Sequence, residues 1–104
     1  MFGPTLAYAV SYIQSDTDRN GLLIKVGSQG ESKIYLNQKE IYRHDKPRKF
    51  VADQDTVTGV VLKRGTNVLV FKVVSVDTVW RASLRFTDAA GLPVKGIRVV
   101  LPRP

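Results

Sequence analysis

The chain has 104 residues, of which 43% are hydrophobic and 24% charged, an ordinary composition for a folded domain. This length predicts one domain over residues 1–104 and leaves no room for two separate cores. The absence of cysteine excludes a disulfide framework and a thiolate metal site. A formal net charge of +7 favours anionic partners such as nucleic acid, anionic lipid or acidic glycans, without choosing among them.

No segment approaches the roughly 18 consecutive apolar residues that a membrane-spanning helix needs. Residues 1–14 lack the basic start and the continuous apolar stretch of a secretion signal. We therefore expect either a cytoplasmic chain or a domain cut from a larger exported protein.

Apolar and polar residues alternate along most of the chain, which is the period of a β-strand. The first expected strand covers residues 7–14, where Tyr8, Val10 and Tyr12 share one side. We expect that side to face the core. The second expected strand covers residues 22–26, after a loop rich in turn-forming residues.

The next two strands are expected to form a hairpin. Residues 32–36 and 39–42 alternate on either side of Asn37-Gln38, which predicts a two-residue turn. Both turn residues then need a positive φ, for which Gln38 is a mild misfit because glycine is the usual second residue. Tyr35 falls on the side opposite the apolar residues of its strand.

The rest of the chain continues the β pattern. After a basic loop at 43–49, which includes His44, the expected segments are a weak strand at 50–52, strands at 56–62, 67–75, 78–86 and 96–101, and turns at 63–66 and 88–91. Trp80 shares a side with Leu84 and Phe86, so we expect it in the core. Eight or nine short strands without a helix predict an all-β antiparallel sandwich or barrel.

Several motifs, in order, resemble those of a known family. The hairpin 33–42 reads Lys-Ile-Tyr-Leu-Asn-Gln-Lys-Glu-Ile-Tyr. Other matching motifs are Val26-Gly27-Ser28, Arg48, Asp53-x-Asp55, Leu62-Lys63-x-Gly65-x-Asn67 and Trp80-x-x-Ser83-Leu84-Arg85-Phe86. Over residues 8–92 the chain resembles the galactose-binding-like jelly rolls, which occur as carbohydrate-binding modules of bacterial exported proteins.

That resemblance implies an antiparallel jelly-roll β-sandwich of about eight strands. It also implies a non-catalytic accessory module, placed outside the cell or in the periplasm if it belongs to a larger exported protein. The N-terminal strands are shorter here than in that family, so we expect an N-terminally truncated or minimal version of the fold.

Calcium is the one cofactor for which the sequence offers candidate ligands. Related modules often carry paired aspartates after the Gly-Ser, but here those positions read Gln29-Gly30-Glu31, which argues against calcium-dependent sugar binding by that route. Asp53 and Asp55 stand two residues apart, so on an extended backbone they share a face and offer hard oxygen ligands for a structural calcium ion. The competing interpretation of this pair is turn and strand-edge residues.

The residue types of an enzyme are scarce. The single histidine, His44, has cationic neighbours and only Asp45 as an orienting partner, so we expect a solvated loop residue. With one histidine and no cysteine a zinc site is not expected. The sequence therefore predicts that the protein is not an enzyme and needs no cofactor.

Binding is the expected function. A pyranose ring has one apolar face and a rim of hydroxyls, so a sugar site pairs an exposed aromatic platform with polar groups. The predicted ligand-binding residues combine platform and charge: Tyr35, Tyr42, Arg43, Arg48 and Lys49.

Three hypotheses follow. The first is a carbohydrate-binding accessory module whose ligand is a glycan or another anionic polymer. The second is a structural or protein-interaction sandwich without a small ligand, and the third is a basic nucleic-acid-binding barrel. The oligomeric state is left open.

Overall fold

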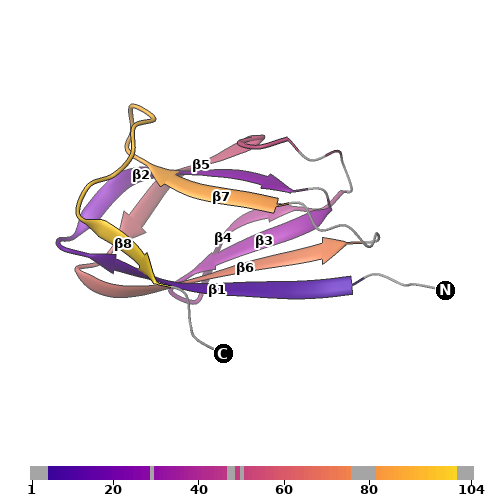
Figure 1. Ribbon diagram of the computed structural model, residues 1–104, viewed down its shortest axis with the longest axis horizontal. Helices are drawn as coiled ribbons and strands as arrows, with labels where there is room; N and C mark the ends of the chain where they lie inside the picture. The colour runs from indigo at the N-terminus through magenta and orange to yellow at the C-terminus, as the bar shows by residue number, and fades with distance from the viewer. Residues whose placement is uncertain (1–4, 29, 47–48, 50, 76–81, 101–104) are drawn as a thin grey trace.

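The computed structural model describes residues 5–28, 30–46, 49, 51–75 and 82–100, which form eight β-strands and no helix (Figure 1). The strands are β1 (Thr5–Ser15), β2 (Arg19–Ser28), β3 (Glu31–Leu36), β4 (Lys39–His44), β5 (Asp55–Leu62), β6 (Gly65–Ser75), β7 (Ala82–Thr87) and β8 (Ile97–Val100). The all-β prediction is confirmed. Within those ranges no helix is long and apolar enough to cross a membrane.

The strands form two antiparallel sheets. One has five strands in the order β4-β3-β6-β1-β8, and the other has three in the order β5-β2-β7. Figure 1 shows the three-stranded sheet lying over the five-stranded one. Because both sheets contribute buried side chains to a single hydrophobic cluster, the architecture is that of a β-sandwich.

The core follows from alternation along the strands. In β2, Leu22, Ile24 and Val26 are buried, as the sequence predicts. Most of the other buried hydrophobic side chains also come from alternate positions, except that a register shift in β5 separates Val57 from Val60 by three residues. They are Ile13, Ile34, Leu36, Val57, Val60, Leu62, Leu69, Phe71 and Val73. Burying these side chains is the main favourable contribution to folding.

Strand β1 corrects one prediction. Tyr8 and Tyr12 are 59% and 37% exposed, whereas Ile13 is buried at 1%. The register explains the difference, because Tyr8 lies opposite Lys72 and Ile13 lies opposite the buried Asn67. The alternation in β1 was predicted correctly, but the side assigned to the core was wrong.

The predicted hairpin is confirmed. Asn37 and Gln38 join β3 to β4 with φ angles of 51° and 72°, the left-handed values that a two-residue turn requires. Gln38 has a Cβ in a region that favours glycine, so the turn stores some strain.

Asn67 ties this turn to the rest of the sheet. Its fully buried side chain donates from Nδ2 to the carbonyl oxygens of Lys63 at 2.8 Å and Ile13 at 3.2 Å. Its Oδ1 accepts from the Lys63 amide and from Asn37 Nδ2, each at 2.9 Å. One amide side chain therefore joins β1, the β5–β6 turn and the β3–β4 turn.

Some predicted boundaries were wrong. β4 continues to His44, so the basic loop begins later than predicted, and residues 51–52 are not in a strand. β6 already begins at Gly65, which leaves a shorter turn before it. Trp80 lies outside the described residues.

Candidate functional site: the outer face of the five-stranded sheet

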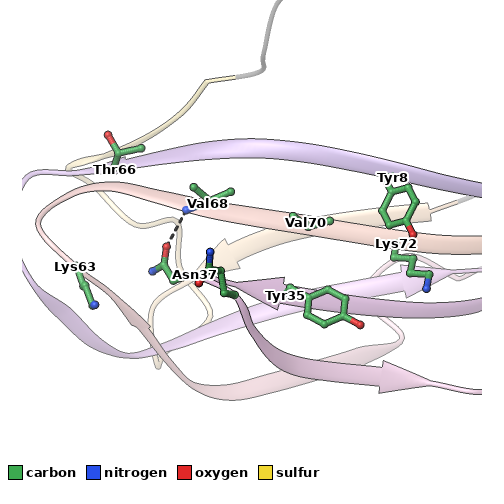
Figure 2. A pocket seen from close by; sticks show the side chains of 9 residues that line it. Tyr8, Tyr35, Asn37, Lys63, Thr66, Val68, Val70 and Lys72 are labelled. Atoms are coloured by element: carbon green, nitrogen blue, oxygen red, sulfur yellow. Dashed lines mark hydrogen bonds between the residues drawn. The ribbon is translucent and has the colours of Figure 1, made fainter.

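The outer face of the five-stranded sheet is hollowed over β1, β3 and β6. This hollow has a volume of about 650 Å³. Its walls come from three strands and two turns, and Figure 2 shows their side chains: Tyr8, Tyr35, Asn37, Gln38, Lys63, Thr66, Val68, Val70 and Lys72. The outward-facing residues of β6 form its floor, because alternate residues of that strand point away from the core.

Two tyrosines and one lysine lie towards one end of the hollow. β6 runs between β1 and β3, so that Lys72 lies opposite Tyr8 on β1, while Tyr35 on β3 lies opposite Val70, two residues along β6 (Figure 2). Lys72 lies opposite Tyr8 in the register, and its Nζ is 5.8 Å from the centroid of the Tyr8 ring. This is a cation–π distance, so the ammonium and the ring hold each other in place.

The other end of the hollow is fixed by hydrogen bonds. The Val68 amide donates to Asn37 Oδ1 at 2.9 Å, and the Asn37 amide donates to the Val68 carbonyl oxygen at 2.8 Å. The β3–β4 turn is therefore held against β6. Gln38 and Lys63 are exposed beside it.

Charge extends across the sheet from Lys72. Lys33 lies opposite Lys72 on one side and opposite Arg43 on the other. Glu40 accepts a hydrogen bond from Arg43 Nη2 at 3.0 Å and lies 4.0 Å from Lys33 Nζ. The hydrogen bond to Glu40 raises the pKa of the Arg43 guanidinium above its usual value.

The structure separates the predicted ligand-binding residues. Tyr35 lines the hollow, and Arg43 lies on the same face but outside it. Lys49 is an exposed loop residue whose carbonyl oxygen accepts from Gln54 Nε2 at 2.5 Å. Arg48 lies outside the described residues.

Tyr42 packs against the core and does not line the hollow. It lies opposite Ile34 in the register and packs, half-buried, against the core. Its hydroxyl donates to Asp55 Oδ2 at 2.6 Å, which links β4 to β5 across the two sheets. Because Ile34 and Tyr35 are neighbours on β3 they point to opposite faces, and Tyr42, opposite Ile34, therefore lies on the face away from Tyr35.

The two candidate calcium ligands bind different partners. Asp53 pairs with Arg85, from Nε at 3.1 and 3.2 Å and from Nη2 at 2.8 Å, and this hydrogen bonding lowers the pKa of Asp53 below its usual 3.8. Asp55 accepts from Tyr42. The part of the chain that the structure describes gathers no group of three or more His, Cys, Asp or Glu side chains suited to a metal ion. Calcium binding by Asp53 and Asp55 stays a prediction.

His44 ends β4 and is half-buried, not a solvated loop residue. Its Nε2 is buried without a hydrogen-bond partner. It lines a small hollow of about 90 Å³ together with Glu31, Asp45 and Lys72. Ser32 lies opposite His44 in the register and lines the same hollow, and its Oγ is 3.0 Å from Ser28 Oγ, with which it shares a hydrogen bond.

Sequence reasoning missed Tyr8 and Lys72. Tyr8 was assigned to the core because it alternates with Val10 and Tyr12, and Lys72 was not considered. The signal that identifies Lys72 is its place between the buried Phe71 and Val73, which forces it outward. Nothing in the local sequence of β1 tells that Tyr8 faces the same way.

Comparison of the chain with protein-family models, curated proteins and solved structures found no match.

Proposed function

We propose that this protein is a non-catalytic carbohydrate-binding module that takes a glycan into the hollow on its five-stranded sheet. The single observation that carries the proposal is the pair of outward-facing rings, Tyr8 and Tyr35, on the two strands that flank β6, where they line the hollow together with Lys72. The apolar face of a sugar can stack on these rings. Polar groups of Lys72, Asn37 and Thr66 line the same hollow and can form hydrogen bonds with its hydroxyls.

A jelly-roll arrangement of the strands belongs to this proposal. Only the β3–β4 connection joins two strands of the same sheet, and every other connection between consecutive strands passes from one sheet to the other. Such repeated crossing supports a jelly roll of the galactose-binding-like kind.

No bond is broken in this mechanism. Val68 and Val70 form an apolar floor between the rings and the turn, so an extended chain of sugars lies along β6 and displaces water from it. Tyr8 is held by Lys72, and Asn37 is held by its hydrogen bonds to β6. Rigid lining residues lower the entropy that binding costs.

The test is titration calorimetry after a screen of neutral and acidic oligosaccharides. Replacing Tyr8 or Tyr35 by alanine should weaken binding at least about tenfold, as expected for buried aromatic anchors. Tyr12→Ala is the matched control, because Tyr12 lies on the same face of β1 as Tyr8 but does not line the hollow. An equal loss of affinity in all three variants, or no binding to any oligosaccharide of the screen, contradicts the proposal.

A protein-interaction function is the second candidate, and a groove between the sheets favours it. This groove has a volume of about 440 Å³ and a mainly apolar lining that includes Ala9, Phe71, Leu84, Phe86 and Ile97. Ala9 faces inward yet is exposed, because the three-stranded sheet does not cover β1 there. Association that persists at micromolar concentration in sedimentation, and that Phe86→Asp abolishes, is the expected result for this function.

A further inference from the structure

The cations on the outer face are arranged in a row that is unfavourable by itself. Arg43, Lys33 and Lys72 occupy directly opposite positions on β4, β3 and β6. Like charges directly opposite each other destabilise a sheet. A row of this kind is tolerated when carboxylates or a bound anion neutralise it.

Carboxylates neutralise only part of the row. Glu40 lies between Arg43 and Lys33, at 3.0 and 4.0 Å. Among the residues that the structure describes, none places a carboxylate within 4.0 Å of the Lys72 ammonium or of the Lys63 ammonium. Both of these lysines line the hollow, whereas Arg43 and Lys33 do not.

These two lysines stand towards opposite ends of the hollow, and Lys72 also lines the small hollow that contains Glu31 and Asp45. Lys63 precedes β6, and Lys72 lies near the far end of that strand. At a rise of 3.3 Å per residue, Thr66 to Lys72 alone spans about 20 Å. Between them the floor is Val68 and Val70, without charge.

We propose that the ligand of the hollow is an acidic glycan, with carboxylate or sulfate groups that pair with Lys72 and Lys63. This inference rests on the proposed function. Its sugar rings lie over Tyr8, Tyr35 and the two valines, and its anionic groups reach the lysines. An uncharged floor between two separated cations suits a sugar chain better than the continuous phosphates of a nucleic acid, which need a continuous basic track.

The experiment compares uronate- and sulfate-bearing oligosaccharides with their carboxyl-reduced or desulfated counterparts by calorimetry. We expect the acidic members to bind at least about tenfold more tightly, with an affinity that falls as salt is raised. Lys72→Gln and Lys63→Gln should each weaken acidic binding about five- to tenfold, whereas Lys72→Arg should retain it. Lys95→Gln, an exposed lysine of the β7–β8 loop, is the control with the same change of net charge.

The outcomes separate this inference from the proposed function. Equal binding of acidic and neutral counterparts overturns the inference and leaves glycan binding intact. If no oligosaccharide of the panel binds, both the inference and the proposed function are overturned. A loss in Lys95→Gln equal to that in Lys72→Gln shows attraction by net charge alone and overturns the inference. Tighter, Lys72-dependent binding of single-stranded polynucleotides overturns it in favour of nucleic acid.

Discussion

Strand β6 carries two different surfaces on one stretch of chain. Its inward-facing side chains are all buried: Asn67, Leu69, Phe71 and Val73. Four of its outward-facing side chains line the hollow: Thr66, Val68, Val70 and Lys72. The strand is the same, but the first set meets only protein and the second set meets solvent.

The polar residue on each face makes the contrast clear. Asn67, on the inner face, satisfies its amide entirely within the protein, as a buried polar group must. Lys72, on the outer face, has an aromatic ring beside it but no described carboxylate within 4.0 Å. The inner face therefore serves stability, and the outer face retains the capacity to bind.

The largest change in the free energy of unfolding is expected at Ile34. Its neighbour on β3, Tyr35, faces the opposite way and should matter much less. Ile34 is fully buried, so Ile34→Ala should lower the free energy of unfolding by about 3 kcal/mol, from lost burial and the cavity left behind. Tyr35→Ala should cost less than about 1 kcal/mol, because Tyr35 faces the hollow. Urea denaturation measures both. Equal destabilisation would break the distinction between the faces.

Asn67→Ala tests the polar part of the inner face. Removing the amide leaves the Lys63 amide and the Ile13 carbonyl without their partner, so the free energy of unfolding should fall by about 2–3 kcal/mol. Thr66→Ala, one residue earlier and exposed, is the control and should change it by less than about 0.5 kcal/mol. Similar denaturation midpoints for the two variants would contradict the role given to Asn67.

A smaller effect, of opposite sign, is expected in the turn that closes the hollow. Gln38→Gly should stabilise the protein by about 0.5 kcal/mol, because glycine adopts the observed φ of 72° without a Cβ clash. Asn37→Gly should destabilise it despite a similar φ, since the Val68 amide loses its acceptor, Asn37 Oδ1, and Asn67 Oδ1 loses its donor, Asn37 Nδ2. Thermal melts of both variants measure this difference, and a gain for both would show that backbone strain dominates.

The smallest change in stability is expected from Asp53, an exposed residue before β5 that pairs with Arg85 of β7. Its pKa is lowered in the folded protein by Arg85, so the pair stabilises the fold above the usual pKa of 3.8 and loses that contribution as pH falls through the lowered value. Asp53→Asn should therefore be slightly less stable at neutral pH and equal to the parent in strong acid. Denaturation midpoints from pH 7 to pH 2 test this, and a constant gap would disprove it.

Local sequence predicted the elements whose signals are themselves local. The turn at Asn37-Gln38 follows from residue types, and the buried stripes of β2 and β6 follow from alternation. Tyr35 was placed on the outer face of its strand for the same reason. These features depend on the two-residue period of a strand, which is present in the sequence itself.

Tertiary structure decided which of the two sides each strand buries and which residues meet. Alternation in β1 is the same whether Tyr8 faces in or out, and only the register with β6 sets Tyr8 beside Lys72. Likewise, Tyr42 meets Asp55 only because β4 and β5 lie in different sheets at the same edge. Strand order and register depend on contacts between residues far apart in the chain, so the sequence by itself predicted a β-sandwich, and only the packed sheets built the hollow.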